Sequence, residues 1–280
     1  MLQSTFCHIP QISLKSERRL WEAGLHSWQA IRSLSELPIK RVSLDALHRH
    51  VEESHIQLRA GNPHYFAEAL PTTEMWRMFP EFRSRIAYLD IETTGMTPGW
   101  NAITTIALYD GEHIYHYIQG HNLHRFERDI QCFDVLVTYN GKTFDVPFIE
   151  RSLGFTLEQA QIDLRYVLRS LGLRGGLKSC EKQMGIRRRG LEDVDGYFAV
   201  LLWKEYKRRN NEKALETLLC YNIHDVVNLE TLLVKAYNQK IKESPFERTH
   251  TIELPRPPKI PFAADKETIE QLRGYLMSRQ

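Results

Sequence analysis

The sequence predicts an α/β fold, a mixed five-stranded sheet flanked by helices, with a small helical region before it. Two observations predict this. The apolar run Ile86–Leu89 ends in Asp90, Glu92 and a Thr-Thr-Gly turn, as a buried central strand does. Together with this strand, two further strand-like segments form a meander. A helix and another strand follow it, and after them the chain is mostly helical. A meander followed by a helical crossover combines antiparallel and parallel pairs in one sheet.

Length and composition are those of an ordinary soluble protein. The 280 residues suggest about two domains, with 42% hydrophobic and 26% charged residues. A formal charge of +2 is too small to indicate a nucleic-acid partner by itself. The four cysteines form no CxxC pair, which argues against a zinc site and a disulfide framework. We find no signal-peptide pattern and no apolar run approaching about 18 residues, so we expect a cytoplasmic protein without a membrane partner.

Residues 1–80 are expected to form a helical N-terminal region. Within residues 6–35, the segment His8–Ser13 resembles the hairpin of a helix-hairpin-helix, which binds nucleic-acid backbone through main-chain N–H groups. Gln11 and Ser13 stand where such hairpins usually have glycine. The alternative is a small helical cap packed on the main domain through Leu20, Trp21 and Trp28.

The main domain is expected over residues 81–240. Its strands are expected at residues 86–89, 102–110, 113–119, 134–139 and 161–164. Its helices are expected at residues 122–132, from 144 onward, and at 165–171, 177–184, 197–209 and 212–239. Residues 241–280 then form a stiff proline-rich connector, Leu254–Pro261, and a terminal amphipathic helix over 266–278.

Two carboxylates follow the first strand. Asp90 and Glu92 are two residues apart, so in an extended chain both side chains point to the same face. Two such charges repel by about 4 kcal/mol at an effective dielectric constant near 20. A cation between them would turn this penalty into binding. The alternative is that they only begin a polar turn.

A third carboxylate, Asp145, follows the fourth expected strand. It stands at the first turn of a helix, where a negative side chain is favourable, so it is either a helix cap or a third metal ligand. The nearby Gly141-Lys142-Thr143 is not a P-loop, because Leu136 occupies the position of its first glycine.

A fourth carboxylate, Asp225, lies inside a long amphipathic helix. Tyr221 is four residues before it and shares its face, whereas the adjacent His224 is rotated by about 100°. A pairing of metal ligand and catalytic side chain therefore favours Tyr221 over His224. The alternative is a structural hydrogen bond between Tyr221 and Asp225.

The three motifs together, Asp-x-Glu, Asn-x3-Phe-Asp and Tyr-x3-Asp, resemble those of the DnaQ-like (DEDD) 3′–5′ exonucleases of the ribonuclease H-like fold. The last motif is similar to the DEDDy branch, since the DEDDh branch would have histidine at Cys220. The resemblance spans residues 85–238 and is closer to YprB-type proteins. The matching segments are Gln161–Leu164, Leu191–Tyr197 and Cys220–Val227, with His8–Pro10 and Leu20–Trp21 in the N-terminal region.

This resemblance implies a metal-dependent 3′–5′ exonuclease that hydrolyses DNA or RNA from a free 3′ end and releases nucleoside 5′-monophosphates. It implies a two-metal-ion mechanism with Mg²⁺ or Mn²⁺, for which all-oxygen ligands are suited. Tyr221, with an ordinary pKa near 10, suits orientation of the attacking water better than the role of base, which stays open. The implied metal ligands are Asp90, Glu92, Asp145 and Asp225, and with Tyr221 they form the implied catalytic set.

Further residues are candidates for substrate binding, beside a structural alternative for each. Thr93 and Thr94 could hold the terminal nucleotide or form a turn, and Asn140 could contact substrate or cap a helix. The other candidates are Phe144 of the second motif and three residues of a basic cluster, Lys178, Arg187 and Arg188. That cluster also contains Arg174, Lys182 and Arg189, and a second contains Lys204, Lys207, Arg208 and Arg209. Such charge runs bind phosphates or form solvated faces.

Two alternatives to the exonuclease stay open: an endonuclease of the same fold, and a non-catalytic adaptor that binds nucleic acid. The sequence identifies no protein partner.

Overall fold

The computed structural model describes residues 1–188, 190–191 and 194–277. Arg189 of the basic cluster, Glu192 and Asp193 of the Leu191–Tyr197 segment and Ser278 of the terminal helix lie outside the described residues. Within the described part, no helix combines the length and the apolar character needed to cross a bilayer.

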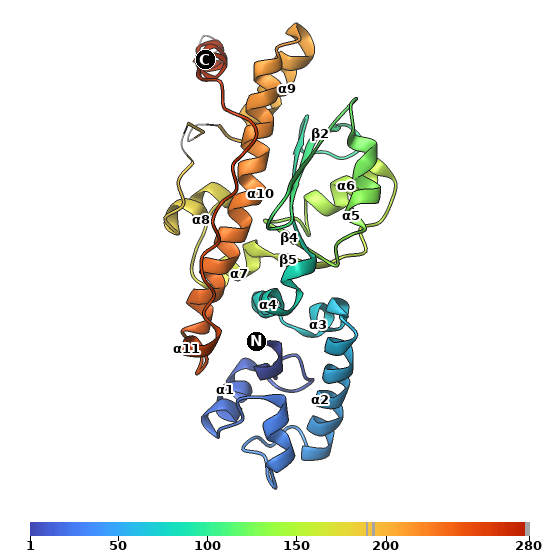
Figure 1. Cartoon of the computed structure of the whole chain (residues 1–280), viewed down its shortest axis with the longest axis vertical. Coiled ribbons are helices and arrows are strands. Elements are labelled where there is room, and N and C mark those ends of the chain that lie inside the picture. Colours follow the sequence, from blue (N-terminus) through green and yellow to red (C-terminus); the bar gives the residue numbers. More distant parts are fainter. Residues whose placement is uncertain (189, 192–193, 278–280) are drawn as a thin grey trace.

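The centre of the molecule is a mixed five-stranded sheet, as predicted (Figure 1). Its spatial order is β3-β2-β1-β4-β5. β1 pairs antiparallel with β2 and parallel with β4, so the first strand is also the central one. The strands are β1 (Ile86–Thr93), β2 (Ile103–Tyr109), β3 (Ile114–Ile118), β4 (Val135–Thr138) and β5 (Ala160–Asp163).

Helices cover both faces of the sheet (Figure 1). α10 (Glu212–Ile241) lies along one face with α9 (Gly196–Arg209) beside it, and α5 (Phe126–Ile130) and α6 (Asp145–Leu153) cover the other. α10 runs for 30 residues because its sequence contains neither glycine nor proline. The Asn211 side chain accepts the N–H groups of Lys213 and Ala214 and caps its first turn.

Most predicted helices occur with ends within about two residues of the expected positions. The helix expected at 122–132 is shorter, because a 3-10 turn, η5 (Leu123–Arg125), precedes α5. The remaining helices of this part are α7 (Leu164–Ser170), α8 (Leu177–Gln183), α11 (Glu247–His250) and α12 (Lys266–Met277).

The N-terminal region mixes α-helices with 3-10 segments. The three side chains expected to pack inward, Leu20, Trp21 and Trp28, are all buried. They belong to a core that continues into the α10 face of the sheet, where Ile86 and Ile162 lie. The elements are η1 (Leu2–Ser4), α1 (Leu14–Glu22), η2 (Trp28–Ser33), α2 (Leu44–Arg59), α3 (Pro63–Ala69), η3 (Thr72–Met78), α4 (Phe79–Phe82) and η4 (Arg83–Arg85).

A buried ion network fixes this region internally. Arg77 is 4% exposed and its guanidinium lies 2.9 Å from Glu17 Oε1 and 2.8 Å from Glu74 Oε2. The same Glu17 oxygen accepts the N–H groups of Phe6 and Cys7, at 2.6 and 3.0 Å. Because each buried charge has several partners, removal of one would leave another uncompensated.

Candidate active site

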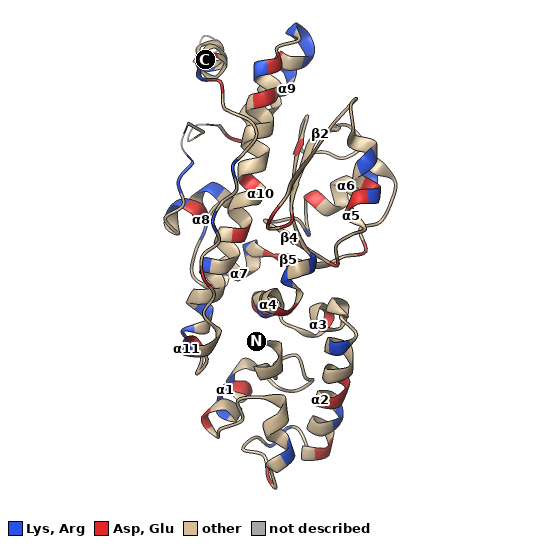
Figure 2. Ribbon diagram, in the orientation of Figure 1, with Lys and Arg blue, Asp and Glu red and all other residues tan. Residues whose placement is uncertain are grey.

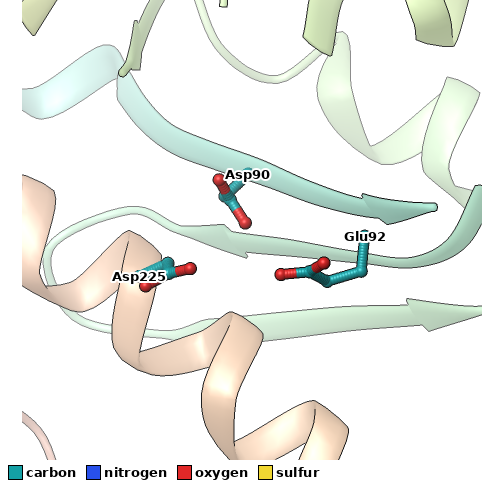
Figure 3. Close-up of side chains that lie close together, drawn as sticks. All are labelled: Asp90, Glu92 and Asp225. Carbon is teal, nitrogen blue, oxygen red and sulfur yellow. The ribbon is translucent and has the colours of Figure 1, made fainter. Parts of the chain in front are cut away.

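Three of the four predicted carboxylates converge at the end of β1. Asp90 and Glu92 project from β1 toward Asp225 on α10 (Figure 3). Each offers an oxygen, and these oxygens all lie within 4.8 Å of one another. The alternation of side chains along a strand places Asp90 and Glu92 on the face that α10 covers.

The fourth carboxylate, Asp145, is brought to the same place by the sheet topology. β1 and β4 are parallel, so they end at the same edge, and α6 begins there after the loop that follows β4. Asp145 Oδ1 accepts the backbone N–H of Ile91 at 3.2 Å, and its side chain lines the same cavity as the other three. It lies outside the 4.8 Å group of Asp90, Glu92 and Asp225.

These carboxylates are largely buried and repel one another. Burial is the largest cause that raises the pKa of Asp90 and Glu92 well above their ordinary values, and the charge of Asp225 adds to it in both cases. Burial also raises the pKa of Asp145 to about 7, although the Ile91 N–H group favours its charged form. Clustered carboxylate oxygens with this electrostatic cost fit a hard divalent cation such as Mg²⁺ or Mn²⁺.

Asn222 orients Asp90, and the sequence analysis missed it. Its Nδ2 group donates to Asp90 Oδ2 at 2.7 Å, and its Oδ1 accepts the hydroxyl of Thr105 at 2.9 Å. The side chain is fully buried, so both of its polar ends are satisfied by the sheet. The available signal was spacing: Asn222 precedes Asp225 by three residues, which places both on the same side of the helix.

Arg188, expected to contact substrate, is buried and is not part of the cavity lining. It is 5% exposed, its guanidinium forms an ion pair with Asp225, and it donates to both oxygens of Glu181 at 2.5 and 2.6 Å. Glu181 Oε1 also accepts from Asn228 Nδ2 at 2.9 Å. Arg188 is therefore an internal counter-charge that positions Asp225. Arg187, by contrast, is exposed and is not part of the cavity lining.

Tyr221 lies in the cavity one helical turn before Asp225, as its spacing predicts, whereas His224 is not among the lining residues. Burial is the main cause that raises the pKa of Tyr221 far above its ordinary value, and Asp225 and Glu92 add to it. Its hydroxyl therefore stays protonated at neutral pH. Lys178 Nζ lies 4.7 Å from the centre of the Tyr221 ring, at the distance of a cation–π contact.

Among the described cations, Lys178 lies closer to the Tyr221 ring than Arg188 does. Its Nζ is buried and makes no hydrogen bond within the described part of the protein, and burial lowers its pKa. This buried ammonium group adds a positive charge beside the acidic cluster, and that charge offsets part of the negative charge of Glu92.

The cavity has a volume of about 810 Å³ and opens at the ends of β1 and β4. The four carboxylates and Tyr221 line it, and so do four of the expected substrate-binding residues, Thr93, Thr94, Asn140 and Phe144. Lys178 is not part of the lining.

The two threonines are already engaged in the loop after β1. Thr93 Oγ1 donates to the carbonyl of Gly95 at 2.7 Å, and Thr94 Oγ1 accepts the N–H of Ala102 at 3.0 Å. The turn role therefore accounts for both hydroxyl groups.

Asn140 does not cap α6, because no side chain among the described residues caps that helix. Its Oδ1 accepts from Thr143 at 2.7 Å and from Arg165, and its N–H donates to Asp163 Oδ1 at 2.8 Å. The loop after β4 is thus fixed by Asp163, a buried carboxylate that the sequence analysis missed. Gly141 permits this path, since a Cβ there would lie 2.2 Å from Thr138 Oγ1.

Comparison with known proteins identifies the superfamily of this chain. Residues 87–237, more than half of the chain, match the RNase_H superfamily. The chain belongs to this superfamily. It is also 29% identical over 193 residues to the uncharacterized protein YprB of Bacillus subtilis (strain 168), which confirms the resemblance to YprB-type proteins. The match covers 60% of this chain and 46% of YprB, so this chain spans about half the length of that relative.

Two solved structures were also found to be similar. One is a family B DNA polymerase from the archaeon Pyrobaculum calidifontis, with 13% identity and a TM-score of 0.42 over 60% of this chain and 27% of the polymerase. The other is the apo form of a nuclease, with 17% identity and a TM-score of 0.31 over 60% of this chain and 89% of that protein.

Proposed function

We propose that this chain is a metal-dependent 3′–5′ exonuclease that hydrolyses phosphodiester bonds of DNA or RNA and releases nucleoside 5′-monophosphates. One observation carries the proposal: Asp90, Glu92 and Asp225 present oxygens within 4.8 Å of one another in a large cavity. Membership of the RNase_H superfamily supports nuclease chemistry at this place. We assign this activity to residues 81–240.

Each catalytic side chain has a role in this proposal. Asp90, Glu92, Asp145 and Asp225 would hold two Mg²⁺ or Mn²⁺ ions. Such ions lower the pKa of a bound water and neutralise charge that develops on the phosphate. Tyr221 keeps its proton and orients the attacking water by a hydrogen bond.

The surrounding residues then bind and orient the substrate. Phe144 is partly exposed in the cavity wall and offers its ring to the terminal base. Lys178 brings a positive charge next to Tyr221, where it favours approach of the scissile phosphate. Arg188 and Asn222 hold Asp225 and Asp90 in place.

The experiment uses single-stranded DNA and RNA oligonucleotides labelled at the 5′ end, incubated with Mg²⁺ or Mn²⁺. We expect a ladder that shortens from the 3′ end, is abolished by EDTA and is absent with Asp90→Asn. Circular single-stranded DNA is the companion substrate, because its cleavage would replace the exonuclease with an endonuclease. Binding of linear substrates without any cleavage would replace it with an adaptor.

A cytoplasmic location is part of the same proposal. Cys7, Cys180 and Cys220 are buried free thiols, a state that reducing compartments preserve. Cell fractionation with detection of the protein tests this location.

A further inference from the structure

A groove between α9 and α12 continues from the candidate active site. It has a volume of about 520 Å³ and is lined by one face of α9 and one face of α12. Tyr197 and Lys204 line both this groove and the cavity that holds the carboxylates. We call it the α9–α12 groove. The two spaces adjoin at these side chains, so a chain-like ligand can occupy both.

The second wall of the groove is a fixed part of the structure. Ile269 and Leu272 of α12 are buried in the core that α9 and α10 form. The N–H of Asp265, just before α12, donates to Thr217 Oγ1 at 2.9 Å, and its carboxylate lies 3.3 Å from Lys213 Nζ. α12 thereby stays next to α9 at the end of the molecule farthest from the N-terminal region (Figure 1).

The α9 wall carries positive charge. Lys204, Arg208 and Arg209 line the groove and are exposed, and the basic end of α9 is visible in Figure 2. Among the described residues of the lining, the one acidic residue is Glu205, whose Oε1 lies 3.4 Å from Arg209 Nη1. Three cations against one carboxylate give these described lining residues a net charge of +2, which favours a polyanion.

Aromatic side chains accompany these cations. Tyr197 is 62% exposed at the junction with the active-site cavity, and Tyr275 of α12 is 44% exposed farther along. Exposed aromatic faces stack on bases whatever their sequence, and cations beside them neutralise the phosphates of the same strand. The groove is continuous with a cavity suited to phosphodiester cleavage, and this continuity favours a nucleic-acid ligand over a protein ligand.

We propose that the α9–α12 groove binds the single-stranded nucleic acid on the 5′ side of the terminal nucleotide. Tyr197 then stacks on a base near the entrance, and Lys204, Arg208 and Arg209 contact successive phosphates. The proposal rests on the proposed function, because the active-site cavity fixes where the 3′ end lies. Its consequence is that substrates of several nucleotides bind more tightly than very short ones.

The test compares oligonucleotides of 3 and 12 nucleotides, labelled with fluorescein at the 5′ end, as DNA and as RNA. Their binding is measured by fluorescence anisotropy with Asp90→Asn protein in EDTA, which prevents cleavage. The double variant Arg208→Ala/Arg209→Ala should bind the 12-mer about tenfold more weakly, and its salt dependence should fall by about 1.4, from two lost phosphate contacts. Binding of the 3-mer should change by less than about twofold.

The matched control is Lys242→Ala/Arg248→Ala. Both residues are exposed and lie beyond the far end of α10, about 45 Å along its axis from the end next to Arg208 and Arg209, yet the charge removed is the same. This control should bind both oligonucleotides like its parent. The proposal would be overturned if the groove variant weakened binding of the 3-mer and the 12-mer equally, or weakened binding of neither. It would also be overturned if the groove variant and the control had equal effects on binding.

Cleavage assays separate this proposal from the proposed function. If the wild type shortens oligonucleotides and the groove variant cleaves the 12-mer equally well, the groove proposal is overturned and the exonuclease proposal stands. If the protein binds the 12-mer through the groove but cleaves no substrate, the groove proposal is supported and the exonuclease proposal is overturned. Failure of the Asp90→Asn protein to bind the 12-mer would overturn the groove.

Discussion

Asp90→Asn should stabilise the metal-free protein while it removes metal binding. The asparagine keeps an oxygen that can accept the 2.7 Å hydrogen bond from Asn222, so the local packing is retained. What changes is the charge next to Glu92 and Asp225. The substitution therefore isolates the electrostatic cost of the acidic cluster.

The distances in the cluster set the magnitude. Two unit charges 4.8 Å apart repel by about 3.5 kcal/mol at an effective dielectric constant of 20. The raised pKa of Asp90 and Glu92 limits how much of this repulsion is present, because shared protons and the Arg188 guanidinium relieve part of it. We expect Asp90→Asn to raise the free energy of unfolding by about 2 kcal/mol in EDTA, or about 5 °C in melting temperature for a chain of this size.

The assay is thermal unfolding at pH 8 in EDTA and in Mn²⁺. Saturating Mn²⁺ at about 100 times its dissociation constant should stabilise the wild type by about 2.7 kcal/mol and the variant by much less, so the order of stability reverses. Asp45→Asn, at an exposed carboxylate on α2, is the control and should respond to Mn²⁺ like the wild type. A variant less stable than the wild type in EDTA, or one with the full response to Mn²⁺, would refute the reasoning.

Three further predictions concern single side chains. Arg188→Met leaves Asp225 and Glu181 buried without their counter-charge, so urea unfolding should show a loss of about 3–5 kcal/mol; a loss below about 1 kcal/mol would mean that Arg188 is not an essential partner. Tyr221→Phe should lower kcat by less than about 100-fold, because the hydroxyl orients water and does not accept its proton. The Mn²⁺ affinity measured by titration calorimetry should stay unchanged. Equal activity of the variant and the wild type would remove Tyr221 from the mechanism. Burial lowers the pKa of His8 from 6.5 to about 3, so between these pH values the unfolded state binds more protons than the folded state, and stability is lost as pH falls below about 6.5. Between pH 7 and 5 the wild type should therefore lose about 2 kcal/mol more of its free energy of unfolding than His8→Gln. Parallel pH profiles of the two proteins would contradict this.

The central strand and its acidic motif were predictable because they are local. Apolar runs followed by Asp90 and Glu92 determine the strand and the face of its side chains, and helical spacing places Tyr221 one turn before Asp225. The order of the motifs along the chain then indicated the RNase H-like fold, with its mixed sheet.

Contacts between distant segments were not predictable in this way. In a run of consecutive arginines, sequence gives no reason why Arg188 turns inward while Arg187 stays exposed. The choice depends on Glu181 and Asp225, which only the folded chain brings to it. Asp163 was missed for the same reason, because its role depends on the path of the loop after β4.

The shared core of the N-terminal region and the sheet limits how this protein can be divided. A shortened chain without residues 1–40 would lose Leu20 and Trp28 from that core, together with the Glu17 carboxylate that neutralises Arg77. The remainder would expose apolar surface and would leave Arg77 with Glu74 but without its second carboxylate partner, so it would unfold or aggregate. Loss of nucleic-acid binding in such a truncation would therefore report the collapse of the whole molecule, and only surface substitutions around Gln11 can reveal whether that turn touches nucleic acid.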